Sequence, residues 1–418
     1  MSEENHIPTV HIPGSKSHSI RALLIAAFSR GVSTIENILF SADTEAVMHA
    51  LEKLGAKLSY ENDILTVDST DLAAELDSVT LDMENSGTGT YLLMGLAASL
   101  GIPVTITGDE SLCSRPIKPL CDAYRTLGAE IEDDNGFPPL TIKGPLKGGC
   151  VSIECRTSQY LSSLLLSSVL AENDTCIRTP VLMEKPYVGM TLQYLNDQKI
   201  DYTISEDLET SSVKGRQHFT PMKMHVGGDY SSACFFFALA AMHGKRVLVT
   251  GLDRYDSQGD KRVLEILEKM GCIIEWNGNE LYIKGPENLK GGTFDLNDIP
   301  DSLPILSVLS TQATEKVVLS NVANARIKET DRIHAMCTEL KKLGADIAEL
   351  EDGIEIMPSR LKGCKVCGYN DHRIIMALSI LDTVLEDKLS IDDTDKVSVT
   401  VPTFFEMLEK VTRELKKN

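Results

Sequence analysis

The chain has 418 residues, 42% of them hydrophobic and 24% charged, a length that suits two or three domains and a composition that excludes disorder throughout. Its 61 acidic and 41 basic residues give a formal net charge of −20, which disfavours nucleic acid and anionic membranes as partners. An anionic ligand therefore requires a local group of cations on an otherwise negative protein.

The first ten residues contain neither the basic region nor the apolar region of a signal peptide. Apolar runs such as 233–242 are shorter than the roughly 20 residues that span a bilayer. Of the ten cysteines, only Cys364 and Cys367 form a C-x-x-C pair, which is too little for a zinc ribbon. We therefore expect a cytoplasmic protein with reduced thiols, no metal site and no membrane span.

Two kinds of helix alternate along the chain and indicate six copies of one α/β unit of about 70 residues. The first kind is amphipathic, ends near a glycine and leads into a strand. Glycine suits a helix end because it takes a positive φ without strain. The residues in this glycine position are Gly55, Gly128, Lys199, Gly271 and Gly344, which are 73, 71, 72 and 73 residues apart.

The second kind of helix follows a polar cluster and precedes a strand rich in Val, Ile and Thr. Segments 160–171, 233–242 and 303–310 are apolar on nearly every face, which is typical of buried helices. We therefore expect the helices inside and the sheets outside, with the polar clusters capping the helix N-termini. The clusters are marked by Ser17, Ser86, Ser158, Ser231, Asp301 and Asp371, at spacings of 69, 72, 73, 70 and 70 residues.

Basic residues lie in or beside several of these helix starts, where the helix dipole disfavours them. Cations on a positive helix end indicate an anionic ligand, because N-termini bind anions readily. The alternative interpretation is capping alone, or a solvated salt-bridged helix end such as the run KETDR. The cations concerned are Lys16, Arg21, Arg115, Arg156, Lys185, Lys328, Arg332 and Arg373.

Nine short motifs occur in order along the chain: PGSKS-x-S-x-R-A, N-S-G-T, S-R-P-I, S-Q-Y-L, K-P-Y, G-D-Y-S-S-A, I-P-D, R-I-K-E-T-D-R and Y-N-D-H-R. With them the chain resembles the 5-enolpyruvylshikimate-3-phosphate synthase family of enolpyruvyl transferases along essentially its whole length. The resemblance implies a two-domain inside-out α/β barrel of six βαβαββ repeats, three per domain, with buried helices and outer sheets. The implied domains are 14–226 and 1–13 plus 227–418, with the active site in the cleft between them.

The resemblance also implies the reaction. The enolpyruvyl group of phosphoenolpyruvate would pass to the 5-hydroxyl of shikimate 3-phosphate with release of phosphate, a step of the shikimate pathway in aromatic amino acid biosynthesis. No metal or organic cofactor is implied, since positioning and electrostatic stabilisation carry such chemistry. We expect the two small molecules as the only partners, and a monomer.

The roles implied for individual residues follow the motifs position by position. Phosphoenolpyruvate would be bound by Lys16, Asn85, Gly87, Arg115, Gln159, Arg332 and Arg373. Shikimate 3-phosphate would be bound by Ser17, Arg21, Thr157, Ser158, Gln159, Tyr187, Asp301 and Lys328. Proton transfer would fall to Asp301 and Glu329, with Lys16 and His372 as further participants.

Three positions depart from the family pattern. Glu184 stands where the family usually has Ser, and Tyr91 stands where it usually has Arg. Near the C-terminus Val399 replaces a usual Lys; Lys396 is three residues away and, on a strand, would point to the opposite face. The two missing cations belong to the side implied for phosphoenolpyruvate.

Other functions remain open at this stage. An enolpyruvyl transferase for UDP-sugars would carry Cys five residues before Arg115, where this chain has Glu110, and Cys113 is at the wrong offset. A paralogue acting on another hydroxyl acceptor is the alternative that the three departures support. A catalytically inactive relative and an RNA-processing enzyme on a related repeat fold are disfavoured, the first by the retained charged residues and the second by the net charge of −20.

Overall fold

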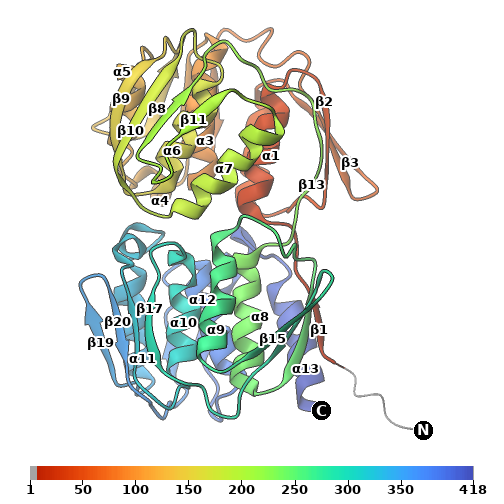
Figure 1. Ribbon diagram of the computed structural model, residues 1–418, viewed down its shortest axis with the longest axis vertical. Coiled ribbons are helices and arrows are strands. Elements are labelled where there is room, and N and C mark those ends of the chain that lie inside the picture. The colour runs from red at the N-terminus through yellow and green to blue at the C-terminus, as the bar shows by residue number, and fades with distance from the viewer. Residues whose placement is uncertain (1–6, 418) are drawn as a thin grey trace. The chain divides into compact units, whose positions relative to one another are not determined.

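The computed structural model describes residues 7–417 and divides the chain into two compact units. One consists of Gly14–Val226 and is called the N-terminal unit below. The other joins Met1–Pro13 to Gly227–Asn418 and is called the C-terminal unit. Both units place their sheets around a group of central helices (Figure 1). Among the described residues, no helix is both long and apolar enough to cross a membrane.

Three four-stranded sheets surround the N-terminal unit, in the orders β13-β2-β4-β3, β5-β6-β8-β7 and β11-β12-β10-β9. In each sheet one pair is parallel and the remaining pairs are antiparallel, as in β5–β6 and β7–β8. The strands are β2 Val32–Glu36, β3 Lys57–Glu61, β4 Ile64–Asp68, β5 Val79–Asp82, β6 Val104–Thr107, β7 Glu130–Asp134, β8 Phe137–Lys143, β9 Gly149–Cys155, β10 Thr175–Leu182, β11 Tyr202–Ile204, β12 Thr210–Val213 and β13 Lys223–His225.

The central helices of this unit are α1 (Lys16–Phe28), α3 (Gly87–Ala97) and α6 (Ser158–Ser168). Nearly every side chain of all three is buried, which explains their lack of a polar face. The remaining helices are α2 Ala42–Lys53, η1 Ala98–Leu100, α4 Glu110–Cys113, α5 Lys118–Thr126 and α7 Lys185–Asp197.

The C-terminal unit repeats this plan with one reduction. Its four-stranded sheets have the orders β1-β14-β16-β15 and β17-β18-β20-β19, whereas the third sheet, within residues 7–417, contains only β21 and β22. The sixth repeat therefore lacks the antiparallel hairpin of the other five. The strands are β1 Thr9–His11, β14 Arg246–Thr250, β15 Ile273–Asn277, β16 Glu280–Lys284, β17 Gly292–Asp295, β18 Val317–Ser320, β19 Ile347–Leu350, β20 Gly353–Ile356, β21 Lys365–Val366 and β22 Ser390–Ile391.

The central helices of the C-terminal unit are α8 (Tyr230–His243), α10 (Leu303–Ser310) and α12 (His372–Asp382), which lie side by side (Figure 1). Most of their side chains are fully buried, so both units confirm the predicted inside-out α/β arrangement. The remaining helical segments are η2 Gly259–Arg262, α9 Val263–Lys269, η3 Pro300–Ser302, η4 Ala323–Ile327, α11 Arg332–Lys342, η5 Thr394–Val399 and α13 Phe404–Lys417.

The glycine position of the repeat has the predicted backbone conformation. Gly55, Gly128, Gly271 and Gly344 have φ between 94° and 103°, and each ends an amphipathic helix. Lys199, which takes this position in the third repeat, also has a positive φ of 56°. A left-handed residue at the helix end is therefore retained even where glycine is not.

Close packing of α3 on α6 depends on a second glycine. A Cβ atom on Gly95 would lie 1.9 Å from the hydroxyl oxygen of Tyr124. That hydroxyl is buried between the hydroxyls of Ser163, at 2.6 Å, and Ser167, at 3.0 Å. The core of the N-terminal unit thus contains a small hydrogen-bonded group that only glycine accommodates.

Candidate active site

The residues implied by the sequence fall into two groups, one in each unit, and nearly all lie at or next to helix N-termini. The N-terminal unit holds Lys16, Ser17, Arg21, Asn85, Gly87, Arg115, Thr157, Ser158, Gln159 and Tyr187. The C-terminal unit holds Asp301, Lys328, Glu329, Arg332, His372 and Arg373.

Lys16 is the first residue of α1, and its ammonium group lies 2.8 Å from Oδ2 of Asp43 in the first turn of α2. The two side chains are only 13% and 8% exposed. A cation at a helix N-terminus opposes the helix dipole, and Asp43 offsets that charge. An anionic ligand at Lys16 would therefore compete with Asp43.

Arg21 is a buried cation on the same helix, with 1% of its surface exposed. Its guanidinium donates to the hydroxyl of Thr191 at 2.9 Å and to the backbone oxygens of Ser17, at 3.0 Å, and Tyr187, at 3.1 Å. Burial lowers its pKa to about 10. Because these hydrogen bonds bring no negative charge to the guanidinium, an anion beside Ser17 and Tyr187 would stabilise it.

Asn85, Gly87 and Arg115 lie together at the start of α3. Arg115 donates from Nη2 to Oδ1 of Asn85 at 2.7 Å, and a Cβ atom on Gly87 would lie 2.9 Å from its Nη1. The Nε of Arg115 and the Oε1 of Gln159 are buried without a hydrogen-bond partner. Gln159 donates instead to the hydroxyl of Thr88 at 3.0 Å. Buried polar atoms of this kind favour a ligand that supplies the missing contacts.

The N-terminus of α6 carries Thr157 as its cap and Ser158 as its first residue. Both donate to one carboxylate oxygen, Oε2 of Glu184, which accepts from the Thr157 hydroxyl at 3.2 Å, the Ser158 N–H at 3.2 Å and the Ser158 hydroxyl at 3.1 Å. Glu184 is 2% exposed. Glu184, one of the three departures from the family pattern, thus occupies the hydrogen-bond donors implied for shikimate 3-phosphate.

In the C-terminal unit, Arg332 is the first residue of α11 and is surrounded by carboxylates. Its guanidinium donates to Asp301 at 2.8 Å, to Glu329 at 2.6 Å and to Asp371 at 2.7 and 3.3 Å. Burial disfavours its charge, but the three carboxylates outweigh this and raise its pKa. Burial likewise raises the pKa of Asp371, which is fully buried and caps α12.

Arg373 and Lys328 extend this cluster. Arg373 lies 3.0 Å from Oδ2 of Asp301, and the ammonium of Lys328 lies 3.9 Å from Oδ1 of the same residue. His372 directly precedes Arg373, is the first residue of α12 and is buried. The side chain of Asp301 is 21% exposed and that of Glu329 22% exposed, so solvent reaches both carboxylates. Two partly exposed carboxylates held by a buried guanidinium form an arrangement suited to proton transfer.

The geometry alone indicates anion binding with paired carboxylates, and comparison with known proteins supplies the family. The family model described as EPSP synthase (3-phosphoshikimate 1-carboxyvinyltransferase) matches residues 6–408. The chain belongs to this EPSP synthase family. The predicted resemblance is therefore confirmed over nearly the whole chain.

Individual relatives of the EPSP synthase family agree in length with this chain. A 3-phosphoshikimate 1-carboxyvinyltransferase of Acetivibrio thermocellus is 44% identical over 404 residues, covering 96% of this chain and 95% of that protein. One from Methanocorpusculum labreanum is 39% identical and covers 98% of this chain and 97% of that protein. A solved EPSP synthase of Acinetobacter baumannii has a TM-score of 0.81 at 27% identity, covering 97% of this chain and 96% of that one.

The structure also places Tyr91 and Val399, the two positions where the EPSP synthase family usually has a cation. Tyr91 lies on α3 and packs edge to face on Tyr160, with ring centroids 5.6 Å apart. Val399 lies at the end of the 3₁₀ helix η5 and not on a strand. In a 3₁₀ helix residues three apart share one face, which places exposed Lys396 on the same face as Val399 rather than the opposite one.

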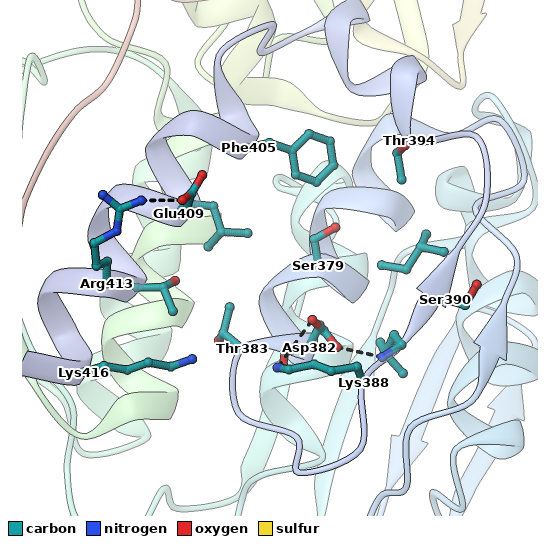
Figure 2. Close-up of a pocket in the computed structure, with 14 residues that line it drawn as sticks. Ser379, Asp382, Thr383, Lys388, Ser390, Thr394, Phe405, Glu409, Arg413 and Lys416 are labelled. Carbon is teal, nitrogen blue, oxygen red and sulfur yellow. Dashed lines mark hydrogen bonds and ion pairs between the residues drawn. The ribbon is translucent and has the colours of Figure 1, made fainter.

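A separate pocket of about 800 Å³ lies among α12, β22, η5 and α13 and contains none of the predicted site residues (Figure 2). Four of its five charged side chains form two ion pairs, Lys388 with Asp382 at 3.5 Å and Arg413 with Glu409, and the fifth is Lys416. The apolar part is lined by Leu389, Ile391, Phe405 and Leu408. We assign no ligand to this pocket.

The sequence did not identify which groups the acidic residues of the site contact. Asp43 lies in the first turn of an otherwise ordinary amphipathic helix, and only folding brings it to Lys16. Asp371 was recognised as a helix cap but not as a partner of Arg332. Glu184 was recognised as unusual, without any indication that it reaches α6. The signal in the sequence is weak: Glu184 comes two residues after β10 ends at Leu182, and Asp43 comes seven residues after β2 ends at Glu36.

Proposed function

We propose that this EPSP synthase transfers the enolpyruvyl group of phosphoenolpyruvate to the 5-hydroxyl of shikimate 3-phosphate, releasing phosphate. The match of the family model to residues 6–408 and full-length relatives at 33–44% identity support this reaction. The chain is thereby a transferase of the shikimate pathway in aromatic amino acid biosynthesis. We further propose that it acts in the cytoplasm as a monomer.

Shikimate 3-phosphate is proposed to bind mainly to the N-terminal unit. The buried Arg21, whose three hydrogen bonds go to uncharged oxygens, supports an anionic acceptor near Ser17 and Tyr187. The donors at the start of α6 would hold its phosphate, since helix N-termini favour anions. The remaining contacts are assigned to Gln159, and to Asp301 and Lys328 of the C-terminal unit.

Phosphoenolpyruvate is proposed to use cations of both units. Lys16, Arg115 and Gln159, with Asn85 and Gly87, would hold its phosphate, and the unpartnered Nε of Arg115 supports an oxygen ligand there. Arg332 and Arg373 would hold its carboxylate. Arg332 already donates hydrogen bonds to three carboxylates. It would therefore attract the carboxylate of phosphoenolpyruvate mainly through its fixed positive charge, and less through additional hydrogen bonds.

The chemistry requires three proton transfers. The acceptor hydroxyl loses a proton as its oxygen adds to C2 of phosphoenolpyruvate, and C3 gains a proton. Loss of a proton from C3 then expels phosphate and restores the double bond. Asp301 and Glu329 are proposed to carry these protons, with Lys16 and His372 taking part. The observation that carries the proposal is that Arg332 holds both carboxylates, at 2.8 and 2.6 Å, while each remains partly exposed.

An acceptor panel tests the proposal. The purified protein would be mixed with phosphoenolpyruvate and, in separate reactions, shikimate 3-phosphate, shikimate or a UDP-sugar, and phosphate release and the mass of the product would be followed. We expect the enolpyruvyl product mainly with shikimate 3-phosphate. Turnover with another hydroxyl acceptor and none with shikimate 3-phosphate would overturn the assignment in favour of a paralogue.

A further inference from the structure

Glu184 ends the loop between β10 and α7, and Thr157 ends the loop between β9 and α6, directly before Ser158. Because β9 and β10 are parallel neighbours, with Cys155 opposite Leu182, both loops emerge at the same edge of the sheet. The backbone N–H of Met183 bonds to the oxygen of Cys155 at 3.0 Å and fixes the distance between the loops. The sheet therefore places Glu184 against the first turn of α6.

The side chain of Glu184 accepts hydrogen bonds from the N-terminus of α6 and does not cap α7, the helix that follows it in the chain. Glu184 is the N-cap residue of α7, yet its side chain makes no capping hydrogen bond there, and the N2 position of α7 is Pro186, which has no N–H. Its backbone is left-handed, with φ of 57° and ψ of 41°, an uncommon conformation for a residue other than glycine. This conformation accompanies a carboxylate that reaches α6, where it accepts from Thr157 and Ser158.

The carboxylate thus fills an anion site with a group of the chain itself. Two hydroxyls and one helix N-terminal N–H converge on a single oxygen of Glu184, whose surface is 2% exposed. Two anions cannot share these donors, because they would repel each other at short range with little water between them. A phosphate can be bound here only after the Glu184 carboxylate has moved away.

We infer that Glu184 determines acceptor specificity in this enzyme by competing with the acceptor's phosphate for the N-terminus of α6. The inference rests on the proposed function, which assigns Thr157 and Ser158 to that phosphate. Its consequence is a weaker preference for a phosphorylated over an unphosphorylated acceptor than the same site would have without the carboxylate. Glu184 is a specificity residue and takes no part in the proton transfers.

Two substitutions test the inference. Glu184→Gln keeps the shape of the side chain and removes its charge, whereas Glu184→Ser adds a hydroxyl donor and removes the competitor. Calorimetry would give the Kd of shikimate 3-phosphate and of shikimate for both variants, for the wild type and for Glu206→Gln, an exposed glutamate of the same unit. Steady-state kinetics with phosphoenolpyruvate would give KM and kcat.

We expect both variants to bind shikimate 3-phosphate about tenfold or more tightly than the wild type, because charge-assisted hydrogen bonds are regained without displacing a carboxylate. Shikimate binding, the KM for phosphoenolpyruvate and the Glu206→Gln control should change little. A merely structural role would alter both acceptors alike. Unchanged or weaker binding of shikimate 3-phosphate in both variants would overturn the inference, whereas absence of turnover in every protein would overturn the proposed function instead.

Discussion

Asp301 and Glu329 accept hydrogen bonds from the same guanidinium group, that of Arg332, at 2.8 and 2.6 Å. The guanidinium is 1% exposed and is also paired with Asp371 at 2.7 Å. A buried, fully paired arginine holds its neighbours in one geometry, because any displacement leaves charge without a partner. These ion pairs therefore hold the two proposed proton carriers in fixed positions.

Neutral substitutes for these carboxylates should lower turnover without preventing binding. We expect Asp301→Asn and Glu329→Gln to reduce kcat by about 10²- to 10⁴-fold, the usual contribution of general acid–base catalysis. The KM for shikimate 3-phosphate should rise less in Glu329→Gln than in Asp301→Asn, since only Asp301 is also assigned to the acceptor. Steady-state kinetics check this, with exposed Glu287→Gln as the control. A wild-type kcat in either variant would rule out its proposed role.

The ion pair between Lys16 and Asp43 predicts opposite effects for its two members. Lys16→Met should lower kcat/KM for phosphoenolpyruvate by about 10- to 100-fold, because a buried anion loses a charge-assisted contact. Asp43→Asn should lower the KM for phosphoenolpyruvate, because the internal competitor for the ammonium is removed. Steady-state kinetics of both variants at constant ionic strength measure these two effects. If Asp43→Asn impairs phosphoenolpyruvate use as Lys16→Met does, the pair acts as a structural unit and not as a competitor.

Two glycines should respond in opposite directions to alanine. Gly95→Ala should lower the free energy of unfolding by about 1–3 kcal/mol, because the new Cβ would lie 1.9 Å from the buried Tyr124 hydroxyl. Gly189→Ala, in α7, meets nothing within 4 Å and should raise it by about 0.5–1 kcal/mol through helix propensity. Urea unfolding measures both. Equal effects of the two substitutions would show that the contact with Tyr124 does not limit the packing of α3 on α6.

His243 predicts a pH dependence of stability. Burial, with Lys245 and Lys416, lowers the pKa of this imidazole below its ordinary value of 6.5. As the pH falls through 6.5 the unfolded chain takes up a proton that the native protein does not, so the native state loses stability until its own pKa is reached. His243→Gln should therefore lose less stability than the wild type between about pH 7.5 and 5.5. Identical pH slopes of the two urea-unfolding series would contradict this, and above about pH 7.5 the two slopes should agree.

Much of the fold could be predicted because it repeats. A helix that is apolar all round must be buried, and the glycine position recurs with a positive φ even where Lys199 replaces glycine. The repeat did not predict the structure of the sixth unit, which has fewer strands than the other five among the described residues. Nothing in the pattern around β21 and β22 distinguished a two-stranded sheet. The segment before Pro402 forms a 3₁₀ helix, so the opposite direction considered for Lys396, which holds only on a strand, does not apply.

The candidate site was predictable in its cations and not in their partners. Lys16 and Arg332 stand out because the helix dipole disfavours a cation at an N-terminus. Asp43 and Asp371 are ordinary helix-start acids in the sequence, and their pairing with Lys16 and Arg332 depends on contacts 27 and 39 residues away. Glu184 was visible as a departure, but its placement on α6 depends on the parallel register of β9 and β10.

The most direct test of the proposed reaction is a phosphorus NMR time course of the wild-type protein with phosphoenolpyruvate and shikimate 3-phosphate. We expect the phosphoenolpyruvate signal to fall while inorganic phosphate rises by the same amount, and the shikimate 3-phosphate signal to be replaced by that of one new phosphate monoester. Persistence of both substrate signals under these conditions, with an enzyme that releases phosphate when another hydroxyl acceptor is supplied, would contradict it.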